Sequence, residues 1–226
     1  CSSDLEISDG AKTGIHRIYH GIDTSLFTNQ KGTESDVSPP YRILTVARMT
    51  PKKGLPTVLR ALKQLAQNGF DIKHTLIGDG DDRDQILALI KNLSLENVTH
   101  WMGTQPHEVV LEQYRQADLF VLGCEVAANG DRDGIPNVLL ESMAMGVPVV
   151  ATNVSAIPEL VETEKTGLLV QPGKPEILAN AMSRLLTDKD LRSRVIPTAR
   201  KCIIEKFDNT TLAQDLAHIH QESLRL

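Results

Sequence analysis

The stretch RDGIPNVLLESMAMGVPVVAT, from Arg132 to Thr152, places an apolar helix directly before a buried strand. Pro136 suits the first position of a helix, and we expect that helix to run to Gly146. The residues VPVVAT, 147–152, form the short β-branched run typical of a strand buried on both faces. The stretch therefore predicts one step of an α/β protein. It also keeps an acid, Glu141, inside an apolar helix that starts with no capping side chain.

The same alternation continues on both sides of this stretch. We expect strands at 42–48, 72–78, 98–103, 119–123, 147–152 and 166–170, and helices at 55–69, 82–94, 107–117, 136–146, 175–186, 189–207 and 210–223. Residues 17–27 predict a further short strand that ends in a turn. Strands alternating with helices indicate a Rossmann-like parallel sheet with helices on both faces. Ligands of such sheets bind outside the carboxyl ends of the strands, so the loops that leave the strands are the candidate sites.

Composition narrows the possible partners. The 226 residues are 41% apolar and 23% charged, which is typical of a globular protein and not of a disordered one. The net charge of −5, without a long basic run, disfavours nucleic acid as a partner. Three cysteines without metal-ligand spacing indicate reduced thiols in a cytosolic protein. No apolar stretch approaches the roughly twenty residues of a membrane span, so we expect no transmembrane segment.

The loop ARMTPKKG, residues 47–54, places three cations at the carboxyl end of the first long strand. Arg48 can grip phosphate oxygens through two hydrogen bonds, and Lys52 and Lys53 act as point charges. These cations are equally consistent with an ordinary solvated loop. The pattern thus leaves a phosphate site and a surface loop as open alternatives.

The loop GDGDDR, residues 78–83, resembles a dinucleotide-binding turn but lacks its third glycine, where Arg83 stands. Its aspartates would repel a pyrophosphate. We therefore favour a tight turn that caps the next helix, in which the glycines could still let a ligand approach the backbone.

The helix start in the opening stretch is a candidate anion site. With Pro136 at the first helical position, Ile135 becomes the cap and has no side-chain acceptor. The amides of Asn137, Val138 and Leu139 are then open, and open amides at a helix start bind anions. The alternative is that Asn137 or water caps the helix.

The two acids of the stretch need different explanations. Burying Glu141 without partners would cost several kcal/mol, so it needs donors such as the two hydroxyls of a sugar diol. The alternative is a salt bridge to a lysine or arginine. Asp133 lies just outside the helix start, where its charge would also favour the helix dipole.

The opening stretch, followed by IPELVETEKTGLLVQPG at 157–173, resembles the donor-binding domain of retaining glycosyltransferases of family four, which have the GT-B fold. That family places seven residues between two acids, as Asp133 and Glu141 have here. YHGID at 19–23, ARMTPKKG, IGDGDD and YRQADLFVL resemble its other motifs. Three places depart from the family pattern: Asp133 replaces a glutamate, Gly-Cys at 123–124 replaces Pro-Ser, and VSAIPE at 154–159 lacks paired glycines.

The resemblance implies a role for each matching residue. The catalytic residues would be Arg48, Lys53 and Asp133, and the substrate-binding residues would be Glu141, Gly134, Ile135, Pro136, Asn137, Val138, Met102 and Thr104. In this assignment Arg48 and Lys53 hold a nucleotide diphosphate, and the helix-start amides hold its distal phosphate. Glu141 binds the ribose, Asp133 contacts the transferred sugar, and Met102 and Thr104 lie near the base.

The reaction implied is transfer of a sugar from a UDP-, GDP- or ADP-linked donor to an acceptor hydroxyl, with retention of configuration. The resemblance implies neither a catalytic metal nor a cofactor. We expect residues 1–27 to be the remnant of an amino-terminal acceptor domain and hinge, 28–40 a linker, and 41–226 the donor-binding domain. The acceptor would be a glycan or a lipid-linked sugar of polysaccharide or glycolipid synthesis. We expect a cytoplasmic protein, with any association with a membrane made through the missing domain.

Three other functions compete with this one. A non-catalytic, nucleotide-binding regulatory module has the same donor half, so the sequence leaves it open. A sugar epimerase of the same fold lacks the paired acids. A nicotinamide dehydrogenase needs a glycine-rich turn after its first strand, and no such turn is present.

Overall fold

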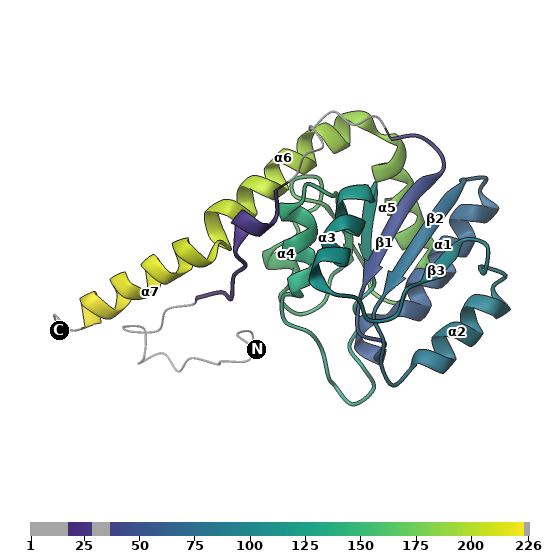
Figure 1. The fold of residues 1–226 in the computed structure, drawn as a ribbon, viewed down its shortest axis with the longest axis horizontal. Helices are drawn as coiled ribbons and strands as arrows, with labels where there is room; N and C mark the ends of the chain where they lie inside the picture. Colours follow the sequence, from purple (N-terminus) through teal and green to yellow (C-terminus); the bar gives the residue numbers. More distant parts are fainter. Residues whose placement is uncertain (1–17, 29–36, 224–226) are drawn as a thin grey trace.

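The structure is a computed structural model and describes residues 18–28 and 37–223. It contains one open sheet of six parallel strands, in the order β3-β2-β1-β4-β5-β6 (Figure 1). The strands are β1 (Tyr41–Val46), β2 (Ile72–Ile77), β3 (Thr99–Trp101), β4 (Leu119–Leu122), β5 (Val149–Thr152) and β6 (Leu168–Val170). The α-helices are α1 (Leu55–Gln67), α2 (Arg83–Asn92), α3 (His107–Gln116), α4 (Asn137–Ala144), α5 (Pro175–Thr187), α6 (Lys189–Lys206) and α7 (Asn209–Ser223).

Helices cover both faces of the sheet. Helices α1, α2 and α5 pack together on one face, and α3 and α4 lie on the other, where α6 packs on α4 (Figure 1). The strand order reverses between β1 and β4, because β2 and β3 extend the sheet in one direction and β5 and β6 in the other. The Rossmann-like sheet expected from the sequence is confirmed. Folds of this kind bind ligands outside the carboxyl ends of the strands, near the position where the strand order reverses.

The six strands expected between residues 42 and 170 and the seven expected helices are present, and none of their ends moves by more than two residues. Strands β4 and β5 are buried along their whole length, as their apolar, β-branched runs predict. Helix α1 buries Leu55, Leu59, Leu62 and Leu65 on one side, which is the spacing of an amphipathic helix.

A buried histidine links four neighbouring strands. Thr45 Oγ1 of β1 donates to the Val121 carbonyl of β4 at 3.1 Å, so it must accept from His74 Nε2, which lies 3.1 Å away. His74 Nδ1 is then the acceptor for Thr99 Oγ1 of β3, at 3.2 Å. Burial lowers the pKa of His74 to about 3, so the ring is neutral and fixed in one tautomer.

The strand expected at 17–27 is wrong. Its described part, 18–27, contains the short 3₁₀ helix η1 (Thr24–Leu26) and a single isolated bridge from Ile22 to Asp208. The Ile22 amide donates to the Phe207 carbonyl and the Asn209 amide donates to the Ile22 carbonyl, both at 2.9 Å. The apolar residues of this segment therefore pack against the junction of α6 and α7 and do not join the sheet. Residues 1–17 and most of the expected linker, 29–36, lie outside the described residues.

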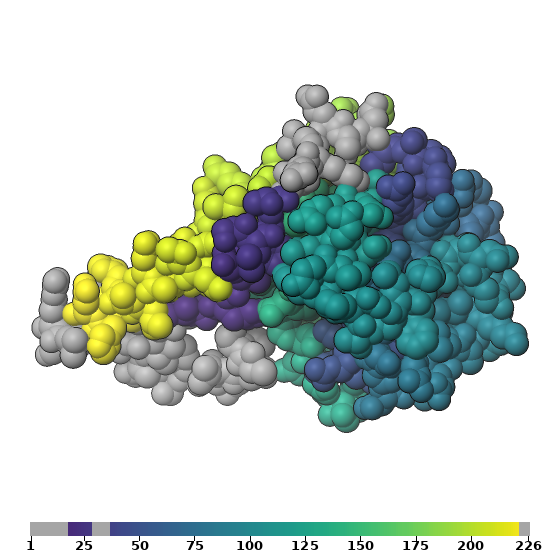
Figure 2. All heavy atoms as spheres, in the orientation of Figure 1, coloured from purple at the N-terminus to yellow at the C-terminus, as the bar shows by residue number. Residues whose placement is uncertain are grey.

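Helix α7 extends away from the sheet as an arm, and residues 18–28 occupy the angle between that arm and the body (Figures 1 and 2). Thr24 Oγ1 donates to Asp208 at 2.5 Å, and the Tyr19 and Phe207 rings lie 5.0 Å apart. At the other end of the segment, Phe27 meets the His107 ring of α3 edge-on at 5.8 Å. These contacts join the segment to both the arm and the body.

Candidate functional site

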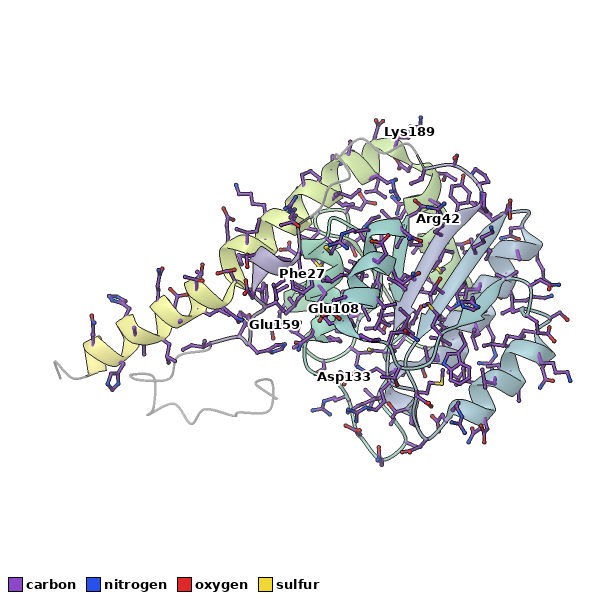
Figure 3. The ribbon with its side chains drawn as sticks, viewed as in Figure 1. Phe27, Arg42, Glu108, Asp133, Glu159 and Lys189 are labelled. Atoms are coloured by element: carbon purple, nitrogen blue, oxygen red, sulfur yellow. The ribbon has the colours of Figure 1, made fainter. Side chains whose placement is uncertain are left out.

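A cavity of about 510 Å³ opens at the carboxyl ends of β1 and β2 and reaches the start of α4. It is lined by Val46, Ala47, Arg48, Thr50, Lys52, Lys53, Ile77, Gly78, Thr104, Gln105, Val110, Asp133, Ile135, Pro136, Asn137 and Val138. Asp133 therefore lies at the end of the sheet opposite Arg42, which stands near the start of β1 (Figure 3). Eight of the eleven site residues predicted from the sequence line this one space.

The loop after β1 forms the basic wall of the cavity. It turns through the 3₁₀ helix η2 (Pro51–Lys53) and reaches α1 through Gly54, which has a left-handed backbone with φ of 58°. A Cβ atom at Gly54 would lie 1.7 Å from the Gly123 carbonyl oxygen, so only glycine fits there. The Glu125 amide donates to the Lys52 carbonyl at 2.9 Å, which fastens the loops after β1 and β4 to each other.

Ion pairs also join the two loops, with lysines on the loop after β1 and aspartates on the loop after β4. Lys53 Nζ lies 2.6 Å from Asp133 Oδ2, and Lys52 Nζ lies 3.1 Å from Asp131 and 3.6 Å from Asp133. Cys124 Sγ lies 3.6 Å from Asp133, and burial raises the pKa of this thiol to about 12, so it is the donor. The sequence alone placed Asp133 beside the helix start, whereas the structure also sets it against two lysines.

Helix α4 begins one residue later than the sequence predicted. Pro136, not Ile135, is the capping residue, and its extended ψ of 128° leaves its carbonyl free to accept from the Leu139 amide at 3.0 Å. The Leu139 amide, one of the three amides expected to be open, therefore has a hydrogen-bond partner. No side chain caps the helix, and within residues 18–28 and 37–223 no hydrogen bond is recorded for the amides of Asn137 and Val138. Asn137 does not cap its own helix.

The second acid, Glu141, is not among the residues that line the cavity. Its Oε2 lies 3.1 Å from the hydroxyl of Tyr114, a fully buried residue of α3 that is also 3.2 Å from the Val138 carbonyl. Burial raises the pKa of Glu141, while the hydrogen bond from Tyr114 and the charge of His107 oppose that rise. The partner recorded for Glu141 in the described part of the chain is thus a phenol and not a lysine or arginine.

Tyr114 was not predicted as a site residue. A buried tyrosine hydroxyl needs a hydrogen-bond partner, and this requirement is the signal that could have drawn attention to it.

Only part of the loop after β3 lines the cavity. Thr104 and Gln105 line the space, whereas Met102 does not, and its carbonyl accepts a hydrogen bond from the Gln105 side chain. Gly134 is likewise absent from the lining. Gln105 and Thr50 were not predicted from the sequence. The Thr50 hydroxyl is buried, with no hydrogen-bond partner among the described residues.

The loop GDGDDR does not cap α2 through a side chain. Its glycines allow close contact with the loop after β1, because Cβ atoms at Gly78 and Gly80 would lie 2.0 and 2.4 Å from the carbonyl oxygens of Ala47 and Met49. The Asp82 amide donates to the Met49 carbonyl at 3.1 Å. The capping interpretation is therefore wrong, and the turn instead braces the basic wall of the cavity.

Two kinds of feature are absent from the described residues. No group of three or more histidine, cysteine, aspartate or glutamate side chains there could hold a metal ion. None of the described helices is both long and apolar enough to cross a membrane.

A family model for glycosyl transferases group 1 matches residues 28–202. The chain belongs to this family. WcaL of Escherichia coli K12, which is assigned to colanic acid biosynthesis, is 37% identical over 204 residues that cover 89% of this chain and 49% of WcaL. The amylovoran biosynthesis glycosyltransferase AmsK of Erwinia amylovora is 37% identical over 80% of this chain and 44% of its own. The chain spans about half the length of these relatives.

A solved structure has the same fold. The crystal structure of Anabaena HepE in complex with UDP-glucose superposes with a TM-score of 0.77 at 25% identity, covering 91% of this chain and 57% of HepE. The open parallel sheet with helices on both faces thus matches glycosyltransferases with the GT-B fold. In this chain, the cavity at the carboxyl ends of β1 and β2 is the candidate ligand site.

Proposed function

We propose that the chain is the donor-binding half of a retaining glycosyltransferase of family four. It would bind a nucleoside-diphosphate sugar for transfer to an acceptor hydroxyl in polysaccharide or glycolipid synthesis. The observation that carries the proposal is the gathering of Arg48, Lys53, Asp133 and the start of α4 around one cavity. The kinship with WcaL and AmsK, which are named for polysaccharide synthesis, supports the same direction.

The cavity offers two kinds of groups to a diphosphate. Arg48 and Lys53 supply cationic donors from the loop after β1, and the amides of Asn137 and Val138 supply neutral donors from α4. Diphosphate is the leaving group in the proposed reaction, so negative charge grows on it in the transition state. Donors fixed beforehand around that charge lower the barrier. No residue of the chain is assigned as general base, because the departing phosphate would take the acceptor's proton.

The two acids would bind the ribose and the sugar of the donor. Glu141 would bind the ribose hydroxyls with one carboxylate oxygen while Tyr114 holds the other. Asp133 would contact the sugar, and Thr104 and Gln105 would lie near the base. HepE has been crystallised with UDP-glucose, and for this chain a UDP-, GDP- or ADP-linked sugar is proposed.

The domain boundaries belong to the same proposal. Residues 41–226 would be the donor-binding domain, residues 28–40 a linker, and residues 1–27 a hinge and remnant of the acceptor domain. The acceptor, a glycan or lipid-linked sugar, would bind to that second domain. The protein would be cytoplasmic, with any contact with a membrane made through the second domain.

The proposal is tested by calorimetric titration with UDP, GDP and ADP and with the matching nucleosides. Arg48→Ala should weaken binding of the preferred diphosphate about ten- to a hundredfold, the range of one charged hydrogen bond, and leave nucleoside binding nearly unchanged. Arg42→Ala is the matched control, because Arg42 is an exposed arginine at the opposite end of β1 (Figure 3). Equal losses in the two variants, or binding of none of the diphosphates by the wild type, would count against the proposal.

A further inference from the structure

One of the cations that line the cavity, Lys53, is already paired with an anion. Lys53 Nζ lies 2.6 Å from Asp133 Oδ2, and the two side chains are only 15% and 16% exposed. Both residues line the cavity. A shielded pair of this kind is screened less by solvent than an exposed surface pair. A phosphate can therefore gain Lys53 only in competition with Asp133.

The neighbouring cations do not remove that competition. Lys52 lies 3.1 Å from Asp131 and 3.6 Å from Asp133, so its charge is divided between two carboxylates. Arg48 lines the cavity, and no carboxylate of the described residues pairs with it. A ligand in the cavity thus meets Arg48, which no described carboxylate neutralises. It also meets Lys53, whose partner Asp133 lines the same cavity.

We propose that Asp133 is a specificity-determining residue that makes the cavity favour a nucleotide-sugar over the free nucleoside diphosphate. The inference rests on the proposed function, because it assumes that a diphosphate binds beside Lys53. A free diphosphate carries one more ionised oxygen on its distal phosphate than a diphosphate esterified to a sugar. Asp133 repels that extra charge while it holds Lys53.

When a sugar is attached to the diphosphate, Asp133 attracts the ligand instead of repelling it. An attached sugar covers the distal phosphate and presents hydroxyl donors where the free diphosphate presents charge. Hydrogen bonds from those hydroxyls to Asp133 would be charge-assisted and therefore strong. One side chain would then weaken binding of the product and strengthen binding of the donor, which favours product release after transfer.

The test compares two ligands on matched variants by calorimetric titration. The ligands are the diphosphate among UDP, GDP and ADP that the wild type binds and its glucose or mannose conjugate. Asp133→Asn, which removes the charge and keeps the shape, should bind the free diphosphate about tenfold more tightly and the conjugate about tenfold more weakly, the size of one charge contact near a protein surface. Asp133→Glu retains the charge and should keep the wild-type preference for the conjugate.

Asp131→Asn is the control for general electrostatics. Asp131 pairs with Lys52 on the outer side, and its side chain is 52% exposed. Its loss should change the affinity for both ligands in the same direction and by a similar factor. The inference is overturned if Asp133→Asn weakens binding of the free diphosphate, or if it shifts both ligands equally, as Asp131→Asn does. Wild-type protein that binds none of the diphosphates would overturn the proposed function, and this inference with it.

Discussion

At the scale of single residues, His74 makes the stability of the fold depend on pH. Burial lowers its pKa to about 3 in the folded chain, against about 6.5 when unfolded. Below pH 6.5 the unfolded chain binds a proton that the folded chain excludes, so the free energy of unfolding falls as pH falls from 6.5 towards 3. Each pH unit in this window should remove about 1.4 kcal/mol.

Urea unfolding at several pH values between 4 and 7 measures this slope. His74→Gln should reduce it, because glutamine takes up no proton. His100→Gln, at an exposed histidine of the neighbouring strand β3, should leave it unchanged. The assignment to His74 is wrong if all three proteins lose stability with the same slope.

Residue types, their spacing and the family resemblance together selected eight of the sixteen residues that line the cavity. Arg48 and Lys53 were recognisable because cations follow a buried strand in an acidic chain, and Asp133 because it precedes an uncapped helix. The ion pair between Lys53 and Asp133 could not be predicted. The two residues are eighty positions apart, and only the packing of the loops after β1 and β4 brings them within 2.6 Å.

At the scale of elements, the contact between two loops sets a strict requirement on Gly54. Ala in a left-handed backbone costs about 1–2 kcal/mol. At Gly54 the new Cβ would also collide with the Gly123 carbonyl oxygen at 1.7 Å, so the loop would have to move. We expect Gly54→Ala to lower the free energy of unfolding by several kcal/mol and to weaken diphosphate binding through the displaced Lys53.

Gly69→Ala provides the comparison in urea unfolding and titration. Gly69 also has a positive φ, 86°, but no atom lies within 4 Å of its Cβ position. This variant should lose only the backbone part of the stability and keep its affinity. Equal losses at the two positions would mean that the steric contact is not decisive.

The helices and strands were largely predictable because their apolar periodicity is strong and glycine or proline marks many of their ends. The exact residues at which these helices and strands begin and end were less predictable. Pro136 is equally suited to the cap and to the first helical position, and its ψ of 128° is decided by the packing around it. Residues 18–27 carry the apolar residues of a strand, but these pack against the α6–α7 junction, which no local pattern reveals.

At the scale of the whole molecule, residues 18–27 tie the arm to the body through few contacts. Thr24 Oγ1 donates to Asp208. This hydrogen bond makes the largest contribution to lowering the pKa of Asp208 to about 2. Thr24→Val removes the bond and keeps the shape. The amides of Ile22 and Asn209 should then exchange hydrogen about tenfold faster, while global unfolding changes little.

Ser25→Ala is the matched control for this experiment. The Ser25 hydroxyl bonds to Asp23 two residues away and does not reach the arm. Its removal should leave exchange at Ile22 and Asn209 unchanged. If the two variants accelerate exchange equally, or if Thr24→Val lowers the stability of the whole domain, the segment does not open as a separate unit.

The chain of side-chain bonds through His74 also gives the molecule an internal spectroscopic reporter. Its imidazole is neutral, carries its proton on Nε2 and touches β1 and β3 through one hydroxyl each. The two ring nitrogens should therefore give nitrogen resonances far apart in chemical shift, and neither should move between neutral pH and about pH 4. A ligand that displaces β1 relative to β2 would change those resonances without touching the ring. Nuclear magnetic resonance at this one residue would thus follow events at the mouth of the cavity from inside the sheet.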